Sequence, residues 1–322
     1  MFPNDNPKCS LAQLKQRAFL LTQIREFFAS RGVLEVETPL LSSSGNSDVS
    51  IESFTSQSIN PTFNKSYLRT SAEFPMKRLI CAGSGDIYEI GKVFRQKEIG
   101  SSHNPEFTML EWYRIDYDYI QLIQDVEELF KSVFLTFGVK CHQSIIMTFK
   151  QCFKKYLRID CELISLKKLN TLCQSYNYDG SALSYNEALD YLFATQIQPM
   201  FQGNRLTFVT LYPASQAALA QINPDDGKTA LRFEVFYQGY ELGNGYQELT
   251  DGDELEKRFI HDNQLRVKQQ KVEIQLDNQL LDATKQGMPK CSGIAIGIDR
   301  LLMSLVGCNN IKEIISFNSQ AS

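Results

Sequence analysis

The chain of 322 residues is long enough for one large domain or two ordinary ones. Its 43% hydrophobic and 22% charged residues are typical of an ordinary soluble globular protein. The formal net charge of −4 argues against extensive binding of a nucleic-acid backbone, since such surfaces usually carry a basic excess.

The cysteines and histidines indicate the cellular compartment and the kinds of metal site that the protein could have. None of the eight cysteines forms a Cys-x-x-Cys pair, and the segment 1–7 is too short and polar for a signal peptide. We therefore expect reduced thiols in a cytoplasmic protein. No apolar run approaches the roughly 18 residues of a membrane span, so no membrane partner is expected. With three histidines and no His-Glu-x-x-His, zinc chemistry has little support.

The first predicted element is a helix over Ser10–Arg31. Ser10 followed by Gln13 is the pattern of a capping box, and Gly32 is a natural stop. Val33–Glu37 alternates as a strand does, so a helix packed on a sheet is expected.

The next stretch combines a loop, a strand and a helix. Leu41–Phe63 is rich in Ser and Asn and is predicted to be loop with short strands; Tyr67–Ser71 is predicted as a strand and Glu73–Ala82 as a helix. Glu73 at the start of this helix suits the helix dipole, and it is also placed to bind an amino group.

The central stretch is predicted to be strand, loop and strand. Asp86–Phe94 and Glu106–Arg114 have strand composition, and the polar Gln96–Pro105 contains a glycine and an Asn-Pro pair. Arg95 stands where the first strand meets the loop, which suits bidentate contact with a phosphate. A period of two puts a carboxylate and a phenol on the same face as apolar side chains, the set being Phe107, Met109, Glu111 and Tyr113.

A second amphipathic helix is predicted over Tyr119–Phe137. The segment that follows, about 140–203, is rich in Lys, Tyr and Cys and contains no chemical motif. Its basic run 150–158 is interpreted as a solvated helix face. The helices predicted there are Thr148–Leu157, Ser165–Tyr176 and Ser184–Ile197.

Two carboxylates stand around a glycine-rich segment. Strands are predicted over Leu206–Tyr212 and Arg232–Leu242, with Gly243-Asn244-Gly245 breaking the second. A turn there would bring Glu241 and Glu248 together, which is costly unless a cation lies between them. Magnesium held by carboxylates and nucleotide phosphates is a common solution; two exposed carboxylates on a hairpin are the alternative.

The last part carries an exposed helix over Asp253–Val272 and a glycine-bearing segment. Gly293 and Gly297 allow close approach of backbone to a ligand, and Arg300 stands at the start of a helix over Leu301–Val306. No Walker or Rossmann loop is present to offer a different nucleotide site.

Three segments together resemble the motifs of class II aminoacyl-tRNA synthetases. The segment 25–39, ending Glu-Thr-Pro, resembles motif 1; the segment 93–114, with Phe-Arg and His-Asn-Pro-Glu-Phe-Thr-Met-Leu-Glu-Trp-Tyr, resembles the lysyl version of motif 2; and 293–301, ending Ile-Asp-Arg-Leu, resembles motif 3. The resemblance implies an α+β fold with an antiparallel sheet flanked by helices. It further implies a single catalytic domain over 1–322, a helical insertion at about 140–203, and a homodimer formed through motif 1.

The resemblance also implies a site for ATP, Mg²⁺ and an amino acid. One departure is Lys97, where the family usually has Glu; either Glu98 or a backbone group makes the adenine contact. The implied catalytic residues are Arg95 and Arg300, and the implied metal ligands are Glu241 and Glu248. The implied ATP contacts are Arg95, Gln96, Lys97, Glu98, Asn104, Glu241, Leu242, Gly297 and Arg300. The implied substrate contacts are Ser71, Ala72, Glu73, Tyr113, Glu248 and Ala295.

The acceptor is inferred from what precedes motif 1, which begins at about residue 17. A lysyl-tRNA synthetase carries an OB-fold anticodon-binding domain there, and a five-stranded barrel does not fit in so few residues. The chain is therefore similar to the elongation factor P–(R)-β-lysine ligase family, which also resembles it in having Ala295 at the middle glycine of motif 3. This implies (R)-β-lysine as substrate, elongation factor P as acceptor and no stable tRNA complex.

Three other interpretations stay open. One is a truncated lysyl-tRNA synthetase-like enzyme. Another is an amide ligase similar to ammonia-dependent asparagine synthetase, which the lysine-type motif 2 and the Glu73 segment argue against. The third is a non-catalytic regulator, supported by Lys97 and opposed by the intact arginines and carboxylates.

Overall fold

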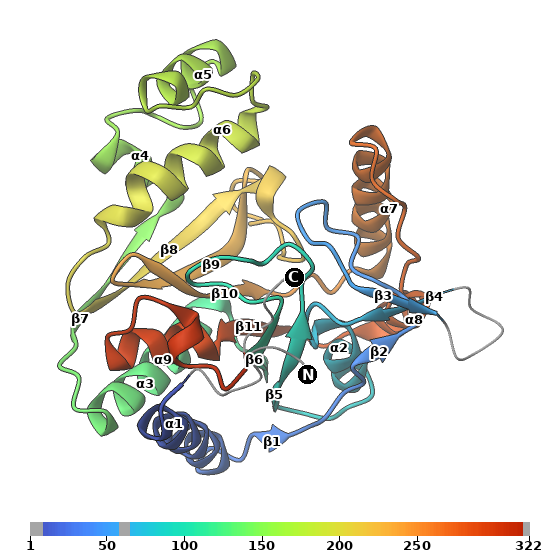
Figure 1. Cartoon of the computed structure of the whole chain (residues 1–322). Helices are drawn as coiled ribbons and strands as arrows, with labels where there is room; N and C mark the ends of the chain where they lie inside the picture. Colours follow the sequence, from blue (N-terminus) through green and yellow to red (C-terminus); the bar gives the residue numbers. More distant parts are fainter. Residues whose placement is uncertain (1–8, 58–64, 318–322) are drawn as a thin grey trace, which may run out of the picture. The chain divides into compact units, whose positions relative to one another are not determined.

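The computed structural model describes residues 9–57 and 65–317, so the expectation for residues 1–7 and the end of the 41–63 loop lie outside the described residues. The chain divides into two compact units, Met1–Val139 with Glu248–Ser322 and Lys140–Gln247 (Figure 1). A search of the described helices finds none that is long and apolar enough to cross a membrane.

The first unit is built on a sheet in the order β1-β5-β6-β11. Strands β5 and β6 pair antiparallel, as the strand–loop–strand prediction for the central stretch required, and β11 pairs antiparallel with β6. The strands are β1 (Leu34–Glu35), β5 (Ile87–Phe94), β6 (Glu106–Ile115) and β11 (Cys291–Gly297), with a separate antiparallel sheet of β2 (Leu41–Ser42), β4 (Lys65–Leu68) and β3 (Thr55–Gln57).

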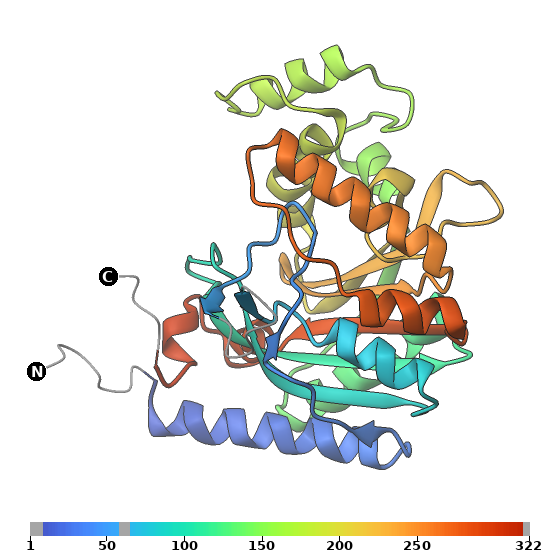
Figure 2. The same ribbon diagram turned by 90° about the vertical axis from the view of Figure 1, so that its right-hand side faces the viewer.

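Neighbouring residues of β6 point to opposite faces of this sheet, and helices pack against both faces. Trp112 packs edge-on against Phe28 of α1 and donates to Asp125 of α3 at 3.1 Å. Tyr113, the next residue, packs in a buried cluster with Met76 of α2. Figure 2 shows α1 running along one face of these strands. The helices are α1 (Leu11–Ala29), α2 (Glu73–Cys81), α3 (Tyr119–Thr136), α7 (Gly252–Lys268), α8 (Asn278–Gly287), α9 (Ile298–Val306) and the 3₁₀ turn η4 (Ile311–Glu313).

Local signals place the ends of the first helix. Ser10 and Gln13 form the predicted capping box, and Gly32 has a φ of 68°, which suits glycine after a helix end. The strand predicted over Val33–Glu37 is shorter, covering Leu34–Glu35. Similarly, α9 begins at Ile298, so Arg300 lies within its first turn rather than before it.

The second unit contains a sheet in the order β10-β9-β8-β7 and the predicted helices. Its core is aromatic, with Phe149 stacked on Phe193 at 5.3 Å between ring centroids. The helix predicted over Ser184–Ile197 is α-helical only in its first part and ends in a π-helix. The elements are β7 (His142–Thr148), α4 (Phe149–Tyr156), α5 (Leu166–Ser175), α6 (Tyr185–Leu192), η1 (Phe193–Ile197), η2 (Gln198–Met200), β8 (Arg205–Pro213), η3 (Ala214–Gln216), β9 (Thr229–Tyr237) and β10 (Tyr240–Gln247).

The predicted turn at Gly243-Asn244-Gly245 is wrong. These residues pair with β9 inside β10, and the hairpin turn is Gln238-Gly239, where both residues have positive φ. Glu241 therefore lies near the start of β10 and Glu248 follows its end, so the two do not flank a turn. Strand β7 and helix α8 were not predicted.

Candidate functional site

A buried lysine lies between two of the predicted substrate carboxylates. Lys77 Nζ is 2.7 Å from Glu73 Oε1 and 2.6 Å from Glu248 Oε2. The side chains of Lys77 and Glu248 are 2% and 1% exposed, and that of Glu73 is 16% exposed. Glu73 and Lys77 face each other because they lie one helical turn apart on α2. Burial raises the pKa of the Glu248 carboxyl above its ordinary value, and Lys77 opposes this shift.

A third buried carboxylate, Glu111 on β6, lies at the start of the same helix. It accepts hydrogen bonds from Ser71 Oγ at 2.5 Å and from the Ala72 backbone N–H at 2.6 Å. Burial raises its pKa to about 7, although these two bonds act in the opposite direction. The predicted substrate residues Ser71 and Ala72 thus hold a carboxylate that changes charge near neutral pH.

Strand β11 provides the small residues beside these carboxylates. Gly293 pairs with Tyr113 and Ala295 with Glu111 in the β6–β11 register. A Cβ on Gly293 would lie 2.4 Å from the Tyr113 ring and 2.9 Å from Glu248 Oε1, so a side chain is excluded there. The absence of a side chain at Gly293 leaves room for the Tyr113 ring and the Glu248 carboxylate.

The two predicted catalytic arginines are joined by residues of the loop between β5 and β6. Arg95 Nη1 is 3.6 Å from Glu98 Oε1, and His103 Nε2 is 3.2 Å from Glu98 Oε2. Arg300 Nη2 contacts the same histidine nitrogen. Arg95 also donates to the Thr70 carbonyl at 3.3 Å. The arrangement places two guanidinium groups and one carboxylate within one continuous set of contacts.

The start of α9 is held by a buried ion pair. Asp299 accepts from Arg17 of α1 at 2.6 Å and from the Thr108 backbone N–H at 2.8 Å. Arg17 also donates to Thr108 Oγ1 at 2.6 Å. These bonds fix the first turn of α9, which carries Arg300.

The remaining predicted ATP contacts lie in different settings. Gln96 and Lys97 are exposed, whereas Asn104 is buried and donates to the Glu106 carbonyl at 2.5 Å. A Cβ on Gly297 would meet no atom closer than 4.0 Å. Leu242 is buried in β10 of the second unit.

The described part of the chain offers few side chains that could coordinate a magnesium ion. Among the described residues, no group of three or more His, Cys, Asp or Glu side chains is placed to hold a metal. A nucleotide-bound Mg²⁺ takes one or two carboxylates and completes its shell with phosphate oxygens and water. Glu241 and Glu248 belong to different units, so their joint binding of Mg²⁺ stays a prediction.

A hollow opens beside the carboxylates within the first unit. Its volume is about 390 Å³, and its lining includes Ser71, Glu73, Ser44 and Arg78. Since two predicted substrate residues line it, the hollow gives a small molecule access to the start of α2.

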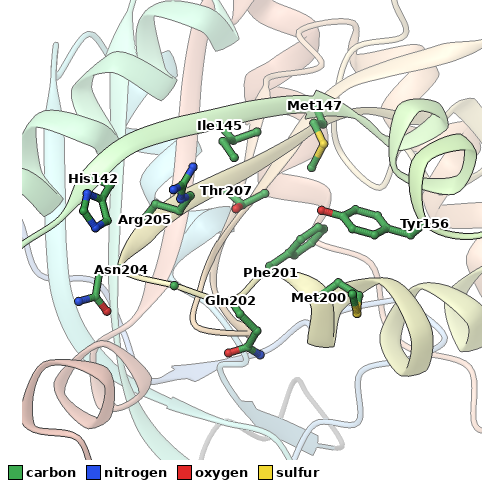
Figure 3. Close-up of a pocket in the computed structure, with 11 residues that line it drawn as sticks. His142, Ile145, Met147, Tyr156, Met200, Phe201, Gln202, Asn204, Arg205 and Thr207 are labelled. Atoms are coloured by element: carbon green, nitrogen blue, oxygen red, sulfur yellow. The ribbon is translucent and has the colours of Figure 1, made fainter.

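The second unit carries a hollow of its own, of about 510 Å³ (Figure 3). Tyr156 and Phe201 lie toward one end, while His142, Asn204 and Arg205 lie toward the other. None of the predicted site residues lines it.

Sequence reasoning missed Lys77 as a partner of both carboxylates, and it missed the contact of His103 with Arg300. The spacing of Glu73 and Lys77 on a predicted helix was a signal for the first ion pair. Glu111 was predicted to share a face with Tyr113, but its bonds to Ser71 and Ala72 were not foreseen.

The arrangement offers two complementary chemical environments in the first unit. The carboxylate cluster, defined as Glu73, Lys77, Glu111 and Glu248, has more acidic groups than basic ones and suits an ammonium ligand. Arg95 and Arg300 suit phosphate oxygens.

Comparison with known proteins gives consistent matches over nearly the whole length of the sequence. A family model described as tRNA synthetases class II (D, K and N) matches residues 6–321. A protein of Pasteurella multocida named elongation factor P–(R)-beta-lysine ligase is 42% identical over 328 residues, covering 98% of each chain. Proteins of the same name from Yersinia enterocolitica and Salmonella arizonae are 40% and 39% identical, each over 97% of this chain and 96% of the relative.

Proposed function

The chain belongs to the class II tRNA synthetase family (D, K and N), and from this premise we propose that it activates (R)-β-lysine with ATP and transfers it to a lysine side chain of elongation factor P. The observation that carries the proposal is the carboxylate cluster, which supplies buried acidic groups for a substrate with two ammonium groups. The relatives named as ligases for this amino acid and this acceptor support the same assignment.

In the proposed first step, the amino-acid carboxylate oxygen attacks the α-phosphorus of ATP and pyrophosphate leaves. Arg95 and Arg300 neutralise phosphate charge, while Glu73 and Glu248 bind an ammonium group and so orient the amino acid. Tyr113, Ala295, Ser71 and Ala72 complete the substrate site. A bound Mg²⁺, with Glu241 and Glu248 as its proposed ligands, would supply further neutralisation of the phosphates.

In the proposed second step, the amine of an acceptor lysine attacks the carbonyl carbon of the aminoacyl-adenylate. A carbon–nitrogen bond forms, the bond between that carbon and the phosphate oxygen breaks, and AMP leaves. The protein's part in both steps is positioning and charge neutralisation.

ATP–pyrophosphate exchange tests this proposal. Wild-type protein is assayed with (R)-β-lysine, α-lysine and aspartate, and labelled product is then offered to elongation factor P or to bulk tRNA. We expect exchange to be strongest with (R)-β-lysine and label to appear on the protein acceptor. Exchange with α-lysine and label on tRNA would make the chain a lysyl-tRNA synthetase-like enzyme, and exchange with aspartate an amide ligase-like one.

Arginine variants test the ATP contacts. Arg95→Ala and Arg300→Ala should each lower kcat for exchange by about 100-fold or more, because each removes a charge that stabilises the transition state. Activity within a few-fold of wild type would remove that arginine from the site.

We also propose a homodimer formed through the first helix and strand. Large apolar side chains are exposed there, among them Leu11 at 67%, Phe19 at 43% and Leu34 at 56%. Burial of these apolar side chains at an interface would favour association. Sedimentation velocity should find a dimer, and Leu34→Asp should shift it toward monomer; a monomeric wild type would refute the proposal.

A cytoplasmic location completes the proposal. The eight cysteines are all free thiols, as expected in a reducing compartment.

A further inference from the structure

Lys77 is buried at a place where its helix otherwise presents apolar side chains. The buried residues of α2 are Met76, Lys77 and Ile80. A buried ammonium is costly unless it is paired, and an apolar side chain of similar volume would fit this face without that cost. Lys77 has two ion-pair partners, one on its own helix and one distant in sequence. Its presence therefore calls for a reason beyond packing.

The atoms in contact indicate what Lys77 does to its partners. It meets Glu73 at Oε1 and Glu248 at Oε2, so one oxygen of each carboxylate is turned toward the same ammonium. The other oxygen of Glu248 faces the backbone of β11, since a Cβ built on Gly293 would lie 2.9 Å from Oε1. Two carboxylates that would otherwise repel each other are thus held side by side in fixed orientations.

We propose that Lys77 is a positioning residue, whose ammonium holds Glu73 and Glu248 together in fixed orientations beside the hollow at the start of α2, where an ammonium group of the amino-acid substrate binds. This inference rests on the proposed function. Lys77 acts through the two glutamates and does not itself touch the reacting atoms. Loss of Lys77 leaves two like charges in contact, so the carboxylates separate and the ammonium site loses its shape.

The test is a comparison of steady-state exchange kinetics for wild type, Lys77→Arg and Lys77→Met. KM for (R)-β-lysine should rise by about tenfold or more in Lys77→Met, because a buried charge pair has lost one partner. Lys77→Arg keeps the positive charge with a different donor geometry, so its KM should lie between those of wild type and Lys77→Met. In both variants KM for ATP should rise far less than KM for the amino acid, because Arg95 and Arg300 supply the proposed phosphate contacts and Lys77 reaches ATP only through the proposed metal ligand Glu248.

A matched control separates this role from a general effect of losing a lysine. Lys131 forms an ion pair with Glu127 at the same i,i+4 spacing on α3, with its side chain 58% exposed. Lys131→Met should leave both KM values unchanged.

The outcomes separate the inference from the proposed function. If wild-type protein fails to activate (R)-β-lysine, the proposed function is wrong. If wild type is active and Lys77→Met has an unchanged KM for the amino acid, or equal increases for both substrates, the positioning role is wrong. If Lys77→Met does not fold, Lys77→Arg decides alone: a rise confined to the amino-acid KM supports the inference, and equal or absent changes overturn it.

Discussion

The two units each contain a cluster of charged side chains, and the clusters differ in how well their charges are matched. In the second unit, Arg232 donates to Glu234 at 2.5 Å, to Asn244 at 3.1 Å and to the Gln216 carbonyl at 2.7 Å. Tyr212 donates to the other oxygen of Glu234 at 2.6 Å. Arginine and glutamate are matched one to one, and every guanidinium nitrogen has an acceptor.

In the carboxylate cluster of the first unit, one lysine contacts two carboxylates, and the third carboxylate, Glu111, accepts from Ser71 and Ala72 instead of from a cation. Burial disfavours each carboxylate charge that no cation matches. The contrast teaches that a buried cluster with matched charges is part of the scaffold, whereas one with an excess of a single sign indicates a binding site.

The largest effect is expected when the ion pair between Arg232 and Glu234 in the second unit is broken. Arg232→Met should lower the free energy of unfolding by about 3–5 kcal/mol, since Glu234 is left without its cation. Denaturant unfolding followed by circular dichroism measures this change. Folded Arg232→Met should keep its KM for (R)-β-lysine within about twofold of wild type. An unchanged stability with a raised KM would assign the Arg232 cluster to the substrate site instead.

The second-largest effect is expected in the carboxylate cluster, where a substitution should change substrate binding more than stability. Glu73→Ala should raise KM for (R)-β-lysine by about 30-fold or more, because the variant removes a partly buried carboxylate that we propose binds an ammonium group of the substrate. KM for ATP should change far less. Steady-state exchange kinetics measure both, and equal increases for the two substrates would refute the assignment of Glu73.

A smaller effect concerns pH. The Glu111 pKa is raised by burial from 4.5 to about 7, so its ionised form accumulates as pH rises through 7 and the carboxylate cluster becomes more negative. KM for the amino acid should therefore fall by about tenfold between pH 6 and 8 in wild type, and Glu111→Gln should flatten this profile. A profile equally steep in Glu111→Gln would place the titration on another group.

The raised pKa of Glu111 should also make the free energy of unfolding depend on pH, in a direction that can be predicted. A raised pKa means that folding favours the protonated form, so this contribution is present below about pH 4.5 and is lost as pH rises through about 7. Wild type should therefore lose stability relative to Glu111→Gln as pH is raised from 5 to 8. The difference between their thermal midpoints measures this change.

The smallest expected effect lies on β11. Ala295→Gly should improve use of α-lysine relative to (R)-β-lysine by about tenfold, since one methyl group is worth only about 1–3 kcal/mol of discrimination. The ratio of kcat/KM for the two isomers measures it, and an unchanged ratio would show that the methyl group does not shape the pocket.

Sequence predicted the parts of the fold that depend on local pattern. The β5–β6 hairpin was found because alternating strands enclose a polar loop, and Arg95 indeed follows the last residue of β5. The turn before β10 was misplaced because Gly243-Asn244-Gly245 is a stronger turn signal than Gln238-Gly239. Pairing with β9 places Gly243-Asn244-Gly245 inside the strand, and the turn falls at Gln238-Gly239. The Gln238 φ of 50° could not be read from the sequence.

Sequence reasoning named candidate residues for the site but did not predict their contacts. Glu73, Tyr113 and Glu248 were named from motif resemblance, while Lys77 was seen only as part of its helix. Its contact with Glu248 depends on the pairing of distant segments, for which period and propensity give no signal.

The bond between Arg17 and Asp299 joins residues 282 positions apart in the chain. Synthesis on a ribosome proceeds from the first of these to the second, so Arg17 is exposed to the cell long before its partner exists. The turn that carries Arg300 is thus fixed by Arg17 only after Asp299 has been made. A nascent fragment that ends before Asp299, however well its first helix forms, lacks the contact that holds this turn.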